Sequence, residues 1–270
     1  MKKYRTALVW FRNDLRTLDH EPLHQACQEA HEVVLAYCLH PNWKSWQTAH
    51  GFAKIGPHRG YRLSRAINDL ATRVSELGGK LHILYQAPEQ AIPDLVARSG
   101  AAALYYYREP AQEERDEEEA VCEALSNQAI LIKPCWGRTL YHPDDVPFAD
   151  EAVPDVYTQF RKKVEKYASV RSTFPVPAAI PSPILNPPHA LEEALSEHFT
   201  DEEIPSVDDR TAVPFDAGES AALAHLQTYI WQDQYVKPYK EPRNGLIGAA
   251  YSTKFSSWLA LGALSPRVIY

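Results

Sequence analysis

The chain has 270 residues, of which 45% are hydrophobic and 23% charged, and its formal net charge is −7. This composition excludes a disordered or fibrous protein, because such chains lack the apolar surface that offsets the entropy cost of ordering. No apolar run approaches the roughly 20 residues that span a bilayer, and no signal-peptide cleavage site follows the first residues. We therefore expect a cytoplasmic protein of one large or two ordinary domains.

The cysteines and histidines give little support to a metal site. No CxxC pair is present, so the thiols match neither a disulfide framework nor a zinc site, and we expect them to be free and buried. They are Cys27, Cys38, Cys122 and Cys135. The letters HEPLH at residues 20–24 match the HExxH zinc pattern, but the proline places them at a helix start, and we interpret them as a solvated helix entrance.

Residues 1–134 alternate between apolar runs and segments of helical periodicity. The apolar runs lie at 7–11, 33–38, 81–85, 103–107 and 129–133, and the helical segments at 23–30, 57–77, 89–98 and 113–125. Nearly continuous apolar runs suit strands that are buried on both faces of a parallel sheet. The pattern predicts an α/β domain with a five-stranded, parallel, doubly wound sheet.

The pattern changes twice after this domain. Over residues 135–215 the alternating pattern is lost, and the stretch 174–214 is rich in proline, at positions 175, 177, 181, 183, 187, 188, 205 and 214. This predicts a long connector that wraps over a surface. Residues 217–231 and 251–261 predict helices of a second, all-helical unit over 216–270, which ends early at Tyr270. We expect Phe255, Trp258 and Leu261 to leave an exposed apolar face that promotes self-association.

Polar residues follow two of the predicted strands. Arg12, Asn13, Asp14 and Arg16 follow the first strand, at the sheet edge where ligands or a neighbouring domain are met. The arginines could equally pair with Asp14 or Asp19 to fix the turn, and both interpretations stay open. The acidic run at 109–123 is interpreted mostly as a solvated helix face. Glu109 is the exception, because at a strand end its carboxylate could accept paired donors from a heteroaromatic ring.

Basic residues surround two aromatic ones in the segment 158–171. Arg161, Lys162, Lys163, Lys166 and Arg171 flank Phe160 and Tyr167, a pattern that could face a phosphate backbone. We favour a helix that packs its aromatic rings inward and its lysines outward.

The residues near the C-terminus offer a site for an anion. Ser252, Thr253 and Lys254 place hydroxyls, backbone donors and an ammonium group at a predicted helix start, where a diphosphate could bind. Capping of the helix by Ser252 or Thr253 explains the same residues. No GxGxxG, GxxxxGK[ST] or GxSxG motif is present, so the usual dinucleotide, P-loop and hydrolase interpretations lose support.

Five segments, in this order, resemble the photolyase and cryptochrome family and most closely its DASH branch. They are WFRNDLR after the first strand, GFAKIGPHRGYRLSRAINDL at 51–70, CWGRTLYHPDDVPF at 135–148, PDVYTQFRKKVE at 154–165, and YKEPRNGLIGAAYSTKFSSWLALGALSPR at 239–267. The resemblance covers nearly the whole chain. It implies an antenna domain over 1–134, an interdomain connector over 135–215 and the beginning of an FAD-binding helical domain over 216–270.

The resemblance also implies cofactors and their contacts. It assigns FAD contacts to Tyr239, Ser252, Thr253, Lys254, Phe255 and Ser256. It places Glu109 against a methenyltetrahydrofolate antenna. The sequence around it, REPAQEER at 108–115, departs from the family's usual sequence there. Because family members continue for about one further domain, residues 252–256 are expected to be exposed or disordered without it.

The implied function is light-driven, FAD-dependent repair of cyclobutane pyrimidine dimers in DNA, with single strands favoured because flipping a base out is easiest there. A sensory blue-light photoreceptor without repair activity, or a stand-alone nucleotide-binding module, remain alternatives. The complete protein is expected to act, and the 270-residue chain alone to be inactive. We expect each tryptophan to pack in a core or interface rather than relay electrons: Trp10, Trp43, Trp46, Trp136, Trp231 and Trp258.

Overall fold

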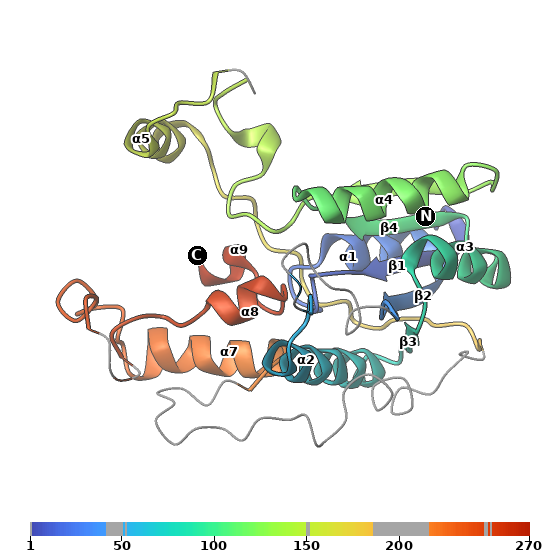
Figure 1. Cartoon of the computed structure of the whole chain (residues 1–270), viewed down its shortest axis with the longest axis horizontal. Coiled ribbons are helices and arrows are strands. Elements are labelled where there is room, and N and C mark those ends of the chain that lie inside the picture. Colours follow the sequence, from blue (N-terminus) through green and yellow to red (C-terminus); the bar gives the residue numbers. More distant parts are fainter. Residues whose placement is uncertain are drawn as a thin grey trace.

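A five-stranded parallel sheet forms the centre of the molecule (Figure 1). The structure is a computed structural model, and it describes residues 2–41, 51, 53–149, 152–185, 216–245, 248 and 250–270. The strands are β1 (Tyr4–Phe11), β2 (Ala30–Cys38), β3 (Leu81–Leu84), β4 (Ala103–Tyr107) and β5 (Leu131–Cys135). Their order in the sheet is β3-β2-β1-β4-β5, and every neighbouring pair is parallel.

Four helices cover the two faces of this sheet. They are α1 (Glu21–Glu29), α2 (Pro57–Glu76), α3 (Pro88–Ser99) and α4 (Gln112–Leu125). Residues of α1 and α2 pack on one face and residues of α3 and α4 on the other, which confirms the doubly wound prediction. The helices change face between β3 and β4, and β4 pairs with β1 rather than with β3.

Alternate residues of β1 serve both cores. Val9 and Phe11 pack with Leu23 of α1, whereas Leu8 and Trp10 face α3 and α4, and all are at most 1% exposed. The side-chain period of two explains this division, since neighbouring strand residues point to opposite faces. A strand that is buried on both faces must be apolar throughout. Its sequence is therefore a continuous apolar run rather than an alternation of apolar and polar residues.

The start of α1 differs from the expected solvated entrance. The helix begins beside Pro22 as predicted, but His20 caps it and is 1% exposed. Its Nδ1 accepts a hydrogen bond from the Leu23 amide at 3.1 Å. The expectation is therefore wrong for His20, because capping by the ring draws it into the core.

The later part of the described connector, residues 174–185, follows the body of the protein. The carbonyl of Phe174 accepts a hydrogen bond from the Asp19 amide, and the Ile180 amide donates to Leu77. This segment wraps over a surface as predicted. The remaining prolines, at 187, 188, 205 and 214, lie outside the described residues.

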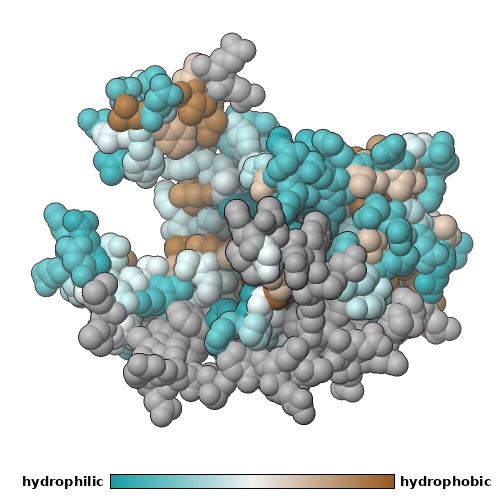
Figure 2. All heavy atoms as spheres, viewed as in Figure 1, coloured by the Kyte–Doolittle hydropathy of each residue, from teal (hydrophilic) through white to brown (hydrophobic). Residues whose placement is uncertain are grey.

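Two elements of the connector stand apart from the sheet (Figure 1). They are the short helix η1 (Pro143–Asp145) and α5 (Tyr157–Tyr167). Val164 is the buried residue of α5, while Phe160 stacks half-buried on Phe148 at 5.5 Å. Tyr167 is 63% exposed, so the prediction of inward-facing aromatic rings is wrong for it. Figure 2 shows a hollow between α5 and the last helices, with hydrophobic side chains along it.

The last 55 residues form α7 (Glu219–Gln227), a π-helical turn η4 (Thr228–Gln232), α8 (Ser256–Ala260) and α9 (Pro266–Ile269). The predicted helix over 217–231 is thus continued by a π turn, and the one over 251–261 starts later. The left-handed φ of +56° at Lys254 interrupts regular helix before Ser256. The start of α9 at Pro266, capped by Ser265, agrees with the sequence pattern.

The expected exposed apolar face is absent from the described C-terminal residues. Phe255, Trp258 and Leu261 are 5%, 2% and 8% exposed. Phe255 and Trp258 pack with Ala222 of α7 and Tyr229 of the π turn, and Leu261 joins the core beneath α2. The expectation is wrong because these residues find partners within the chain, so the self-association based on them loses its reason.

The described tryptophans differ in how far they are buried. Trp10 and Trp258 are buried as expected, and Trp136 is half-buried. Trp231 is 67% exposed, so it does not pack in the core of this chain, and its packing at an interface stays a prediction. Trp43 and Trp46 lie outside the described residues. Within the described ranges, no helix has both the length and the apolar character needed to cross a bilayer.

Candidate functional site

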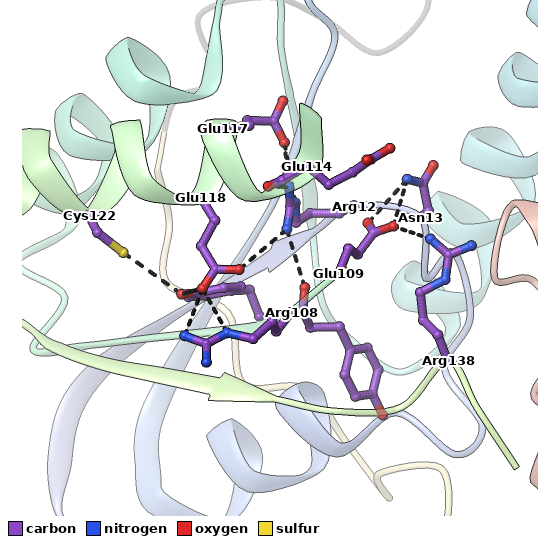
Figure 3. Close-up of polar contacts among 11 residues, drawn as sticks. Arg12, Asn13, Arg108, Glu109, Glu114, Glu117, Glu118, Cys122 and Arg138 are labelled. Atoms are coloured by element: carbon purple, nitrogen blue, oxygen red, sulfur yellow. Dashed lines mark hydrogen bonds and ion pairs between the residues drawn. The ribbon is translucent and has the colours of Figure 1, made fainter. Parts of the chain in front are cut away.

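Strands β1 and β4 are neighbours in the sheet, and the crossover helices change face between β3 and β4. In open α/β sheets, ligands bind outside the carboxyl ends of the strands at such a switch point. The residues that follow β1 and β4 therefore lie at the sheet edge where a ligand is expected. Figure 3 shows them close together, with Arg12 and Asn13 from one loop and Arg108 and Glu109 from the other.

Glu109 is a buried carboxylate at this switch point. It is 3% exposed, and the Asn13 side-chain amide donates to its two oxygens at 3.1 and 3.2 Å. Arg138 forms an ion pair with it, and the second guanidinium nitrogen of Arg138 donates to the Ala260 carbonyl at 3.2 Å (Figure 3). Glu109 is thereby connected to α8, so the antenna residue inferred from the sequence lies at the junction of the two units.

The Arg12 side chain holds α4 against the sheet. Its guanidinium donates to the Glu117 carboxylate at 2.9 Å and to the Glu114 carbonyl at 2.5 Å, and it lies 4.7 Å from the Trp10 ring. Burial raises the pKa of Glu117, an effect that the charge of Arg12 opposes. Glu117 is half-buried, whereas Glu118 is buried and accepts from the Tyr106 hydroxyl at 2.9 Å. The acidic run is thus a solvated face in most positions, but Glu117 and Glu118 have structural partners.

The loop after β1 fixes its own turn and also meets the helical unit. The Asp14 carboxylate accepts from the Arg12 amide at 2.5 Å, while Arg16 donates to the Asp19 carbonyl at 3.1 Å. Arg16 also donates to the Gly262 carbonyl at 2.9 Å. Both interpretations of the loop are therefore correct in part: the arginines fix the turn, and a neighbouring unit is met at this edge.

The histidines of the HExxH letters are occupied by protein partners. The Nε2 of His20 lies 2.8 Å from the Asp14 carboxylate, and Nδ1 caps α1. Burial opposes ionisation of Asp14, yet the contacts with His20 and with the Arg12 amide hold its pKa below the usual range. Among the described residues, no group of three or more potential ligands is arranged to hold a metal ion.

A cavity of about 90 Å³ lies beside the ends of β1 and β2. Its lining includes Arg12, Tyr37, Cys38, Arg59 and Glu117. Burial raises the pKa of Cys38, so its thiol is protonated and a poor nucleophile. Pockets for cofactors usually measure roughly 300–1,000 Å³, so this cavity is too small for one as it stands.

The residues assigned to FAD from the sequence are largely gathered in one turn before α8. Ser252, Thr253 and Lys254 are half-buried, Phe255 is buried and Ser256 is exposed. The Lys254 ammonium group lies 3.6 Å from the Tyr251 ring centre and donates to its hydroxyl. The turn is partly covered because α7 packs against it, so the expected exposure is confirmed for Ser256 alone among the five residues.

Tyr239 lies apart from this turn. It follows the π turn and is 40% exposed, and within the described residues no hydrogen bond joins its side chain to residues 252–256. Glu109 is likewise separate and reaches this end of the chain only through Arg138. The structure therefore brings five of the seven predicted residues together and leaves Tyr239 and Glu109 outside the turn.

Two buried carboxylates anchor the helical unit, a role that the sequence did not suggest for either of them. Glu219 of α7 accepts from the Thr17 amide at 2.8 Å, from the Leu18 amide at 2.8 Å and from Arg73 at 2.6 Å. Asp19 pairs with Arg267 of α9 at 2.7 Å. Acidic residues are common in the first turn of a helix, so the position of Glu219 in the sequence does not indicate this role.

A profile of the family described as DNA photolyase matches residues 7–182. The chain belongs to the DNA photolyase family. Within this family it is similar to proteins named Cryptochrome DASH, at 44% identity for the one from Synechocystis sp. and 42% for the one from Xenopus laevis. Both matches cover 98% of this chain, but only 53% and 51% of the relatives. The chain thus spans about half the length of the curated photolyase-family relatives that it matches.

Solved structures of photolyase-family proteins have the same fold. The Synechocystis sp. PCC6803 cryptochrome superposes with a TM-score of 0.88 at 42% identity, over 100% of this chain and 55% of that one. An archaeal photolyase from Sulfolobus tokodaii, described with two FAD molecules, superposes with a TM-score of 0.71 over 98% of this chain and 54% of that one. At 15% identity, the second match supports the fold alone.

Proposed function

We propose that the chain is the N-terminal portion of a DASH-type cryptochrome or photolyase. The whole protein would use FAD and blue light to split cyclobutane pyrimidine dimers, with single-stranded DNA as the preferred substrate. Membership of the DNA photolyase family and 37–44% identity to proteins named Cryptochrome DASH over nearly the whole chain support this proposal. The relatives are about twice as long, so the activity is proposed for the whole protein, and the 270-residue chain alone is proposed to be inactive.

The turn over residues 251–256 carries the FAD part of the proposal. The backbone amides of Ser252, Thr253 and Lys254 donate to no acceptor among the described residues, and two hydroxyls and an ammonium group lie beside them. Donors without acceptors suit the oxygens of a diphosphate, so the residues fit this group. We propose that FAD is held by Tyr239, Ser252, Thr253, Lys254, Phe255 and Ser256.

The chemistry that FAD supplies in this proposal is a light-driven electron transfer to the damaged bases. The residues of this chain contribute by binding and orienting the cofactor. A dimer is cheapest to flip out of a single strand, because no base pair and less stacking are lost, which supports the choice of substrate. Lesion-contacting residues are proposed to lie in the half that the relatives have in addition.

The antenna assignment rests on Glu109. A pterin ring presents paired N–H donors, and a buried carboxylate at the switch point is a suitable acceptor for them. We propose methenyltetrahydrofolate as this ligand, in the junction between an antenna domain over 1–134 and a helical domain that begins at 216. The ligand would compete with Arg138 for the Glu109 carboxylate. A cytoplasmic location is also proposed, although relatives from plants are named chloroplastic/mitochondrial.

A fusion of this chain with the second half of the Synechocystis relative tests the proposal. The fusion is purified in the dark and given a single-stranded oligonucleotide that contains a thymine dimer. We expect restoration of thymine absorbance under blue light and none in the dark. Bound flavin without any repair would favour the sensory alternative, and tight retention of a nucleotide by the 270-residue chain alone would favour a stand-alone nucleotide-binding module.

A further inference from the structure

A histidine of α7 packs against two aromatic rings, one just before α8 and one within it. The ring of His225 stacks on Trp258, with centroids 5.0 Å apart and an angle of 29° between the planes, and it meets the Phe255 ring edge-on at 5.7 Å. These two ring contacts, at different angles, fix the plane of the imidazole. A 180° flip of the ring keeps the same plane, so the position of its nitrogens is decided by the hydrogen bond.

The hydrogen bond of His225 is made to the backbone of the proposed FAD turn. Its Nε2 lies 2.9 Å from the carbonyl oxygen of Thr253. A carbonyl oxygen can only accept, so Nε2 carries the proton and donates. Because the peptide is trans, the N–H that follows a carbonyl points in the opposite direction. The Lys254 amide is thus turned away from α7.

Lys254 itself shows that this orientation needs support. Its φ of +56° lies in the left-handed region, which a residue with a Cβ atom adopts only at an energetic cost. No described residue accepts a hydrogen bond from its amide. The turn therefore keeps a strained residue with an unbonded donor, and the described hydrogen bond from His225 to Thr253 is the contact that holds the preceding peptide in place.

We infer that His225 is a positioning residue, which directs the Lys254 amide at an anionic oxygen of the bound dinucleotide. This inference rests on the proposed function of the turn, because the anion is a phosphate of FAD. A histidine that only fills space between α7 and α8 would make the same ring contacts. It would not, however, require a donor at Nε2, and this difference makes the two roles separable.

Two variants and a control separate these roles in the ligand-free chain. H225F keeps the ring and loses the donor, H225Q restores a donor without the ring, and H58F changes an exposed histidine on α2. Ring ¹⁵N shifts of the unmodified chain should show the Nε2–H tautomer of His225. The order parameter of the Lys254 amide should fall from about 0.85 to below about 0.6 in H225F, and should recover in H225Q. An Nδ1–H tautomer, or an unchanged order parameter in a folded H225F, would overturn the inference.

Binding of FAD is measured on the same four chains, each fused to the second half of the Synechocystis relative, and gives an independent result. Equilibrium dialysis should show that H225F weakens FAD binding by about fivefold to tenfold, the worth of one hydrogen bond, while H225Q and H58F stay within about twofold of the unmodified chain. If the unmodified chain in this fusion binds no FAD, the proposed function of the turn fails, and the order parameters still decide the role of His225. If FAD binds equally to all four proteins, the role of His225 fails and the FAD assignment stands.

Discussion

At the scale of single residues, buried carboxylates hold distant segments of the chain together. Asp19 has a fully buried side chain that accepts from Arg267 at 2.7 and 3.0 Å, from the Phe174 amide at 3.1 Å and from the Ser265 hydroxyl. Its partners lie 155 to 248 positions away in sequence. No local pattern can indicate such a role, whereas Glu109 could be selected because it directly follows a strand.

Replacing Asp19 by asparagine should destabilise the chain strongly. The substitution removes the charge that compensates Arg267, which is 7% exposed, and breaking a buried pair in this way costs about 3–5 kcal/mol. The matched control is Asp94→Asn, because Asp94 pairs with Arg98 on the surface and such pairs contribute about 1 kcal/mol or less. Urea denaturation measures the free energy of unfolding of both variants. Equal losses in the two variants would contradict the role of Asp19.

His82 should make the stability of the fold sensitive to mild acid. It is 1% exposed, and burial, with smaller contributions from Lys80 and Arg98, lowers its pKa to about 4. Its Nδ1 has no hydrogen-bond partner among the described residues. Since the unfolded pKa is about 6.5, the unfolded state binds the proton first, and stability is lost as the pH falls from about 6.5 to about 4.

The expected loss between about pH 7.5 and pH 5 is on the order of 2 kcal/mol. His82→Leu should remove this part of the pH dependence, because leucine has no proton to bind, while His58→Leu on the exposed start of α2 should keep it. Unfolding free energies at the two pH values give the comparison. An unchanged slope in His82→Leu would show that another group titrates.

At the scale of helices and strands, elements with a complete local pattern were predictable. The apolar runs predicted all five strands, and the helical segment at 57–77 predicted α2. The C-terminal helices were less predictable, because their limits depend on contacts between segments. Lys254 ends the turn in a left-handed conformation that its residue type does not favour, and α8 begins only after it. The burial of Trp258 depends on α7 and on its hydrogen bond to the Asp216 carbonyl at 2.9 Å.

Rates of amide hydrogen exchange should differ sharply between neighbouring residues of the segment 251–263. The amides of Trp258, Leu259 and Ala263 donate to backbone carbonyls at 2.9–3.1 Å, and they should exchange about as slowly as the Gly100 amide at the end of α3. The Lys254 amide has no described acceptor and should exchange rapidly. Uniformly rapid exchange over residues 251–263 would mean that the segment is not folded onto α7.

At the scale of the whole molecule, the helical unit is fitted onto the carboxyl edge of the sheet. Gly262 has a φ of +63°, and a Cβ atom there would lie 2.0 Å from the Asn13 carbonyl oxygen. The Leu15 amide donates to the Leu261 carbonyl at 3.1 Å beside it. The backbones of the two units thus touch directly, at the sheet edge where the sequence placed a ligand or a neighbouring domain.

Gly262→Ala should therefore separate the two units. Gly100→Ala is the matched control, because Gly100 has a φ of +65° but no atom within 4 Å of the Cβ position. Both variants carry the left-handed strain of roughly 1–2 kcal/mol, and Gly262→Ala adds a collision with backbone that cannot move aside. Limited proteolysis should release the residues after 216 only from Gly262→Ala. Release from both variants, or from neither, would contradict the fit.

The central claim is that this chain contributes to the FAD site of a photolyase-family protein. It is tested most directly by the visible absorption spectrum of the fusion with the second half of the Synechocystis relative, purified without added cofactor. We predict a yellow protein with one FAD per chain, and loss of most of the flavin when Ser252, Thr253 and Lys254 are all replaced by alanine. A correctly folded fusion without flavin, or full retention of flavin by the triple variant, would contradict the account.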